Sequence, residues 1–179
     1  MTSTTRNPHL EDITTQAHDL FDQLDDDTRA IALSVLRTLS QPRQVVTGSF
    51  TQVLGLAYTA IGDGRCSATL EVQPHLLNPL GIAHGGVAFA LADSTCGGAA
   101  LSALGERRLV TQDMQIRYHA PARAGTLVAH AETVHKGSRT ITTQCRITQN
   151  DVLIASVTGT FAILSPDEIT SIKESLANS

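Results

Sequence analysis

Residues 78–86 read NPLGIAHGG and lead directly into VAFALADSTCGGAALSAL at residues 87–104. The second stretch consists of small and apolar residues with adjacent alanines, which predicts a helix over residues 84–104. Gly97 and Gly98 each cost that helix about 1 kcal/mol relative to alanine. Such a cost is accepted where neighbouring backbone approaches closely, so we expect the helix to lie packed inside the protein.

The same helix resembles a membrane span in length, because residues 86–104 contain only one charged residue, Asp93. A carboxylate at the centre of a bilayer costs roughly 3 kcal/mol, and the stretch is rich in Ala, Gly, Ser and Thr rather than Leu, Ile and Phe. The N-terminus also lacks the basic stretch and apolar run of a secretory signal. We therefore predict no membrane association and no export.

Short runs with a strand-type pattern lie on both sides of the helix. In the last run, Leu153, Ala155 and Val157 fall on one face, whereas Ser156 and Thr158 fall on the other. Turn residues separate neighbouring runs, which favours antiparallel pairing. The expected strands are 53–60, 65–73, 108–119, 125–136, 139–149 and 151–163. The sequence thus predicts an α+β fold in which an antiparallel sheet wraps around one long central helix.

Both ends of the chain have helical patterns. Residues 1–40 predict two helices that form a hairpin, and a final helix is expected over 166–177. The first helix carries an apolar stripe that needs a partner surface on the rest of the chain or on another subunit. The stripe consists of Leu10, Ile13, Ala17, Leu20 and Leu24. We divide the chain into an N-terminal helical extension (1–44), a main domain (45–165) and a C-terminal helix or tail (166–179).

The composition excludes several classes of partner. Thirteen Lys and Arg against seventeen Asp and Glu give a net charge of −4, and the chain has no Trp, so nucleic acid is not an expected partner. Cys66, Cys96 and Cys145 match neither a zinc-ligand spacing nor a redox pair. We expect no metal site and a reducing, cytoplasmic location.

The start of the predicted helix and its single acidic residue, Asp93, suggest catalytic chemistry. The N–H groups of His84, Gly85 and Gly86 lack intrahelical partners and can donate to an oxygen that gains negative charge; the alternative is that the glycines serve only to turn the chain. Asp93 is costly to bury without a partner. It is either a hydrogen-bonded structural residue or the nucleophile or base that hydrolyses an activated acyl group.

The spacing of these groups predicts a dimer. His84 and Asp93 are nine residues apart, which is about 13.5 Å along a helix with a rotation near 180°. They therefore cannot meet within one chain. If they act together, a second copy related by a two-fold axis brings its Asp93 beside His84 and Gly85, giving two sites per dimer.

Three motifs together resemble a known family. They are Asn78-x2-Gly81-x2-His84-Gly85-Gly86-x2-Phe89-x-Leu91-Ala92-Asp93, Tyr118-x2-Pro121-x3-Gly125 and Gly137-x-Arg139-Thr140. Together they resemble the hotdog-fold acyl-CoA thioesterases, and most of all the PaaI-like branch, over about residues 48–163. The resemblance implies a hotdog fold, with a long helix wrapped by an antiparallel sheet. It also implies a homodimer that pairs edge to edge and again into a homotetramer.

The resemblance further implies hydrolysis of an acyl-CoA to a free acid and coenzyme A, with no separate cofactor. In that family Gly85 N–H would polarise the thioester carbonyl, His84 and Asn78 would organise the site, and Asp93 of the partner subunit would attack or activate water. Thr111 matches a position where relatives hold the attacking water with a hydroxyl. The coenzyme phosphates would lie at the turn formed by Lys136, Gly137, Ser138 and Arg139, with Lys136 and Arg139 supplying charge.

Two alternatives stay open beside the thioesterase. A hotdog enoyl-thioester hydratase or dehydratase would need an acid–base pair around the substrate's α and β carbons, and its usual fingerprint is absent. A non-catalytic hotdog protein that senses acyl-CoA lacks a DNA-binding module here, because residues 1–45 carry seven Asp and Glu against four Lys and Arg. Cys96-Gly97-Gly98 replaces a bulkier, often aromatic stretch of the PaaI-like enzymes, so the acyl preference stays open.

Overall fold

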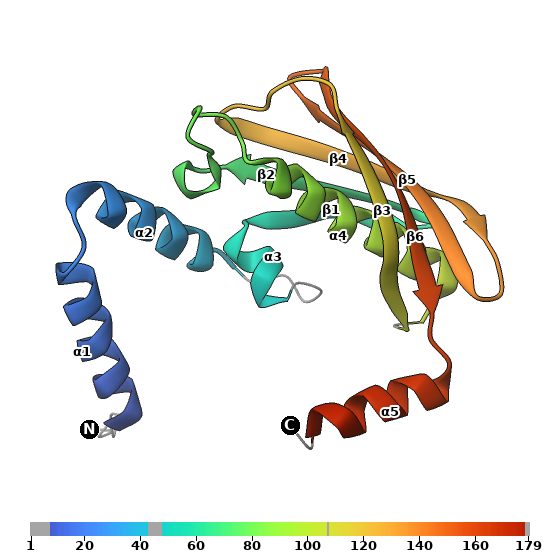
Figure 1. Ribbon diagram of the computed structural model, residues 1–179, viewed down its shortest axis with the longest axis horizontal. Coiled ribbons are helices and arrows are strands. Elements are labelled where there is room, and N and C mark those ends of the chain that lie inside the picture. The colour runs from blue at the N-terminus through green and yellow to red at the C-terminus, as the bar shows by residue number, and fades with distance from the viewer. Residues whose placement is uncertain (1–7, 43–47, 107, 178–179) are drawn as a thin grey trace, which may run out of the picture.

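The computed structural model describes residues 8–42, 48–106 and 108–177. One six-stranded antiparallel sheet, in the order β1-β2-β4-β5-β6-β3, curves around the helix α4, Gly85–Leu104 (Figure 1). The strands are β1 (Leu56–Gly62), β2 (Arg65–Val72), β3 (Leu109–Tyr118), β4 (Gly125–Lys136), β5 (Thr140–Gln149) and β6 (Val152–Ile163). The hotdog architecture expected from the sequence is confirmed, and the predicted central helix is correct to within one residue.

The core lies between α4 and the inner face of the sheet. Leu91, Cys96 and Ala99 of α4 are fully buried against inward-facing strand residues such as Leu127 and Ile147. Alternation along each strand produces this face, because successive side chains point to opposite sides of a sheet. Although α4 is long and apolar enough to cross a membrane, 56% of that stretch is buried inside the protein. Its apolar character is therefore that of a core helix.

Glycine is required where α4 passes closest to the sheet. A Cβ atom on Gly98 would lie 2.7 Å from Cys66 Sγ, which is too close for any side chain. The helix ends at Gly105, whose φ of +82° is readily adopted only by glycine, and its N–H caps the Leu101 carbonyl. The close approach explains why this helix accepts glycine near its middle.

The first strand begins later than the sequence pattern predicts. Residues Ser49–Val53 form a short helix, α3, and the chain then turns at Gly55 with a φ of +71° before β1 begins at Leu56. The predicted strand 53–60 is thus wrong at its start. Tertiary contact explains the difference, because Gln52 Nε2 donates to the Leu39 carbonyl and ties α3 to the preceding helix at 3.2 Å. The predicted boundary between residues 44 and 45 lies outside the described residues.

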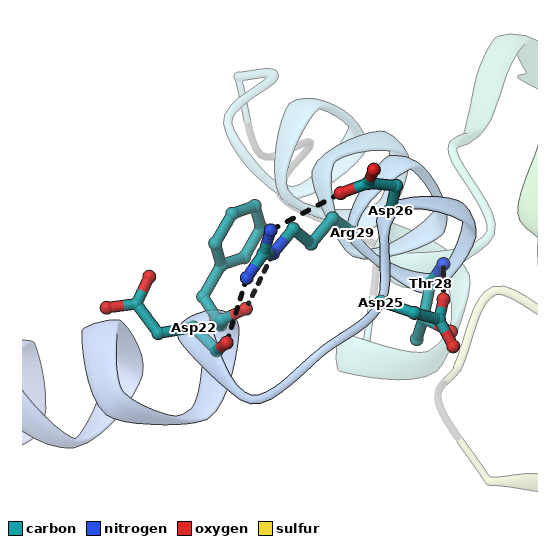
Figure 2. A network of polar contacts seen from close by, with 6 residues as sticks. Asp22, Asp25, Asp26, Thr28 and Arg29 are labelled. Carbon is teal, nitrogen blue, oxygen red and sulfur yellow. Dashed lines mark hydrogen bonds and ion pairs between the residues drawn. The ribbon is translucent and has the colours of Figure 1, made fainter.

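The N-terminal extension contains α1 (Pro8–Asp22) and α2 (Asp26–Leu39). The two helices form an open elbow instead of the predicted hairpin (Figure 1). Figure 2 shows how the elbow is held: the Arg29 guanidinium donates to the carbonyls of Phe21 and Asp22 at 3.2 and 2.8 Å and pairs with Asp26 at 3.3 Å. Asp25 caps α2 by accepting from the Thr28 N–H at 2.8 Å.

The described part of the protomer leaves most of the apolar stripe of α1 uncovered. Ile13 and Leu20 are 60% and 64% exposed, while the side chain of Leu10 lies outside the described residues. Besides the Gln52 contact, α2 is attached to the domain by a 2.9 Å hydrogen bond between Ser34 Oγ and His75 Nδ1, in the 3-10 helix Pro74–Leu76. The C-terminal helix α5, Pro166–Ala177, forms as predicted and extends away from the sheet (Figure 1).

Candidate active site

Asn78 shapes the loop that precedes α4. Its side-chain Oδ1 accepts from the N–H groups of Leu80 and Ile82 at 2.9 and 3.4 Å, and its backbone pairs with Ile82 and Gly81. Gly81 takes a φ of +71°, which favours glycine at this turn. Because Oδ1 already accepts these two hydrogen bonds, the Nδ2 group is the part of the side chain that remains available, as a hydrogen-bond donor. Asn78 therefore organises the loop that precedes α4, and its role in a catalytic site stays a prediction.

The start of α4 offers fewer backbone donors than the sequence predicts. The His84 N–H donates to the Leu76 carbonyl at 2.9 Å, and the Gly86 N–H donates to His84 Nδ1 at 3.0 Å. The expectation of three available donors is wrong, because tertiary pairing and the His84 cap use two of them. Within the described part of the chain, Gly85 N–H is the one of the three with no hydrogen bond.

Asp93 and Thr111 are brought together within one protomer. The Thr111 hydroxyl donates to Asp93 Oδ1 at 2.8 Å, which joins the edge strand β3 to α4. A bulge between Thr111 and Asp113 shifts the register of β3 beside β6 at this point. Asp93 is half-buried rather than fully buried, since it lies with Gly86 and Phe89 on the side of α4 that the sheet leaves uncovered.

A hydrophobic cavity of about 380 Å³ opens at the N-terminal end of α4. Asn78, His84 and Gly85 line it together with Tyr118 and His119, and its remaining lining includes Ile82, Ala88, Ala120, Pro121 and Ile154. Eight residues separate Gly85 from Asp93, so the two are about 12 Å apart along the straight axis of α4. The cavity therefore contains the free amide but not the carboxylate of the same chain.

The turn after β4 lies beside the C-terminal end of α4. Lys136 Nζ donates to the Ala103 carbonyl at 2.7 Å and so caps the C-terminal end of α4. Gly137 N–H closes the turn on the Thr140 carbonyl at 2.9 Å, while Ser138 and Arg139 are exposed. Within one protomer this turn is near the opposite end of α4 from Gly85, and its contact with a coenzyme stays a prediction.

The thiols of Cys66 and Cys145 offer no second nucleophile. Burial raises the pKa of Cys66 to about 12, and a hydrogen bond with Cys96 together with burial raises the pKa of Cys145. Thiols held in this way stay protonated and unreactive at neutral pH. Across residues 8–42, 48–106 and 108–177, no three His, Cys, Asp or Glu side chains form a group that would hold a metal ion.

One contact at the site was not predicted from the sequence. Tyr118, quoted only as part of a motif, donates its hydroxyl proton to the Gly85 carbonyl at 2.8 Å. The two residues are 33 positions apart, and β3 must return along α4 to bring them together. The only available sequence signal was the tyrosine's place in the motif with Pro121.

Comparisons with known proteins give a consistent result. The Thioesterase superfamily profile matches residues 80–155. The chain is 29% identical over 112 residues to the 1,4-dihydroxy-2-naphthoyl-CoA hydrolase of Escherichia coli strain K12, covering 62% of this chain and 78% of that protein. It is 28% identical over 102 residues to the proofreading thioesterase EntH of Cronobacter sakazakii, covering 56% and 74%.

Solved structures agree with these relatives. A variant of the phenylacetic acid degradation protein PaaI from Thermus thermophilus is 31% identical with a TM-score of 0.62, covering 65% of this chain and all of that one. A conserved protein of Pseudomonas aeruginosa is 34% identical with a TM-score of 0.65, covering 66% of this chain and 95% of that one.

Proposed function

Because the chain belongs to the thioesterase superfamily and is a thioester hydrolase of PaaI-like fold, we propose that its substrate is an acyl-CoA, which it cleaves to a free acid and coenzyme A. Support for a coenzyme A ester comes from the E. coli relative, whose name describes hydrolysis of a naphthoyl-CoA. Support from the structure comes from the cavity beside Gly85, which is lined mainly by apolar side chains suited to an acyl group.

The observation that carries the proposal is the pairing of Thr111 with Asp93 at 2.8 Å on the uncovered side of α4. A carboxylate held by a hydroxyl, with room beside it, is arranged to attack an acyl carbon or to take a proton from water. Gly85 N–H, the free donor at the positive end of the helix, is arranged to stabilise the negative charge that the carbonyl oxygen gains.

The proposed site is shared between two protomers. Gly85 and the Asp93 of the same chain are about 12 Å apart along the helix axis, so they need a second copy to act on one thioester. A two-fold axis beside the uncovered side of α4 would bring each Asp93 toward the partner's Gly85. The exposed edge strand β3, which carries Thr111, is available to pair at such an interface.

The reaction balances with water as the only co-substrate. Water, or Asp93 followed by water, adds to the thioester carbonyl carbon, and the negative charge moves to the oxygen beside Gly85 N–H. The C–S bond then breaks, the sulfur leaves as thiolate and takes up a proton, and the acid is released.

We further propose that the coenzyme phosphates lie at the turn from Lys136 to Arg139. We also propose that the protein is cytoplasmic, which its three free buried thiols support.

A panel of short-chain, long-chain and aryl acyl-CoAs tests the substrate class by measuring release of free thiol. We expect release from at least one member, and loss of release in Asp93→Ala while the circular dichroism spectrum is unchanged. Binding of acyl-CoA with no thiol release would support the sensor alternative. Gain of water by a crotonyl-type substrate without thiol release would support the hydratase.

Mixed dimers test whether the site is shared. Asp93→Ala and Gly85→Pro chains, each inactive alone, are co-expressed with different tags. Under the shared arrangement each heterodimer holds one intact site, so a random mixture regains about a quarter of wild-type activity. No recovery would show that the two groups act within one chain or not together.

A further inference from the structure

The peptide between Gly85 and Gly86 is held by side chains at both of its polar atoms. Tyr118 Oη donates to the Gly85 carbonyl at 2.8 Å, and His84 Nδ1 accepts from the Gly86 N–H at 3.0 Å. We call these two hydrogen bonds the clamps. One comes from His84 at the helix N-cap and the other from Tyr118 on β3, so they reach the peptide from different elements of the fold. The N–H groups of the first helical turn otherwise have no intrahelical partner.

The two side chains that bind this peptide, and not the backbone angles, leave little room for a Cβ at either glycine. A Cβ on Gly85 would lie 3.1 Å from Tyr118 Oη, and a Cβ on Gly86 would lie 3.0 Å from His84 Nδ1. Neither glycine has a positive φ. Each clamp thus occupies the space where a side chain would stand, which ties the two glycines of the motif to Tyr118 and His84.

Tyr118 is suited to donate here at neutral pH. Partial burial raises the pKa of Tyr118, so the phenol keeps its proton. The ring also lines the same cavity as Gly85 and His84. Its hydroxyl, however, is committed to a backbone carbonyl, which argues against a direct role in proton transfer.

We infer that Tyr118 is a positioning residue: together with His84 it fixes the Gly85–Gly86 peptide, and by anchoring Gly85 it restrains the adjoining His84–Gly85 peptide, whose N–H faces the thioester oxygen. The inference rests on the proposed function. Without the phenol hydroxyl the Gly85 carbonyl loses its side-chain donor, and the first residue of the helix is held less firmly. A donor that must reorganise during the reaction stabilises the developing oxyanion less than a fixed one does.

The chain supplies a matched control, because its only other tyrosine makes a similar bond elsewhere. Tyr58 donates to the Ser94 carbonyl of the same helix at 3.3 Å and does not line the cavity beside Gly85. Tyr118→Phe and Tyr58→Phe each remove one hydroxyl that binds an α4 carbonyl. They are compared by thiol release, by thermal unfolding and by amide exchange at Gly85 and Gly86.

We expect Tyr118→Phe to lower kcat about tenfold, equivalent to about 1.4 kcal/mol of transition-state stabilisation, with little change in KM or in the shape of the pH–rate profile. Its Gly86 amide should exchange faster, whereas Tyr58→Phe should match the wild type in both readouts.

Equal kcat in the two variants, or a Tyr118→Phe effect confined to KM, overturns the inference. Loss of an alkaline limb also overturns it, since Tyr118 would then be an acid in the reaction. A wild-type protein that cleaves no thioester overturns the proposed function itself.

Discussion

Thr111 Oγ1 lies 2.8 Å from Asp93 Oδ1, so an edge strand and the central helix share one hydrogen bond on the side of α4 that the sheet leaves open. The bond fixes a carboxylate where a partner subunit or a substrate can reach it. It also fixes a hydroxyl with lone pairs left to accept a hydrogen bond from water. The two residues together form the part of the proposed site that one protomer supplies to its partner.

Two substitutions of Thr111 distinguish the contribution of its hydroxyl to activity from that of its side-chain shape. Thr111→Val keeps the branched side chain but removes the donor, and hydrogen bonds to charged groups contribute about 1.5–3 kcal/mol, so kcat should fall about 10- to 100-fold. Thr111→Ser keeps the hydroxyl and should retain most of the activity. Thiol release from the best acyl-CoA measures both. Equal activity of the valine and serine variants would show that the hydroxyl does not contribute.

Gly85 permits a direct test of a backbone donor. Proline is tolerated at the first residue of a helix, and His84, with φ −60° and ψ 138°, already has the conformation that precedes proline. Gly85→Pro removes the free N–H, so kcat should fall about 10²- to 10³-fold. Gly85→Ala adds a Cβ that crowds Tyr118 but keeps the N–H, and should lose less. Similar losses in both variants would assign the effect to crowding.

The sequence predicted the elements of this site better than their contacts. Small-residue composition and period placed α4 to within one residue, because a buried helix leaves a long uniform pattern. Pairing of the His84 N–H with Leu76, and of Tyr118 with Gly85, depends on segments that meet only after folding. The short helix at Ser49–Val53 was missed for the same reason, since its tie to α2 is not visible in local sequence.

One polar contact between the N-terminal extension and the domain can be removed by a single substitution. Ser34 is buried, and its hydroxyl binds His75 Nδ1 at 2.9 Å, while His75 Nε2 is buried with no hydrogen-bond partner among the described residues. Ser34→Ala leaves both ring nitrogens unpaired and should cost about 1–3 kcal/mol locally. Amide exchange in α2 should rise while α4 stays protected. Ser40→Ala, which removes an exposed bond to the Arg37 carbonyl, is the control and should change little.

The buried Cys66 thiol predicts weakening of the fold at alkaline pH. Burial raises the pKa of Cys66 from its ordinary 9.0 to about 12, so between these values the unfolded chain has lost a proton that the folded chain keeps. Rising pH then favours the unfolded state, and this one group lowers the free energy of unfolding by up to about 1.4 kcal/mol per pH unit. Denaturant titrations from pH 8 to 11 should show the decline, and Cys66→Ala should reduce its slope, although the smaller side chain lowers stability at pH 8. Identical slopes in the two proteins would mean that the thiol reaches solvent in the native state and ionises there.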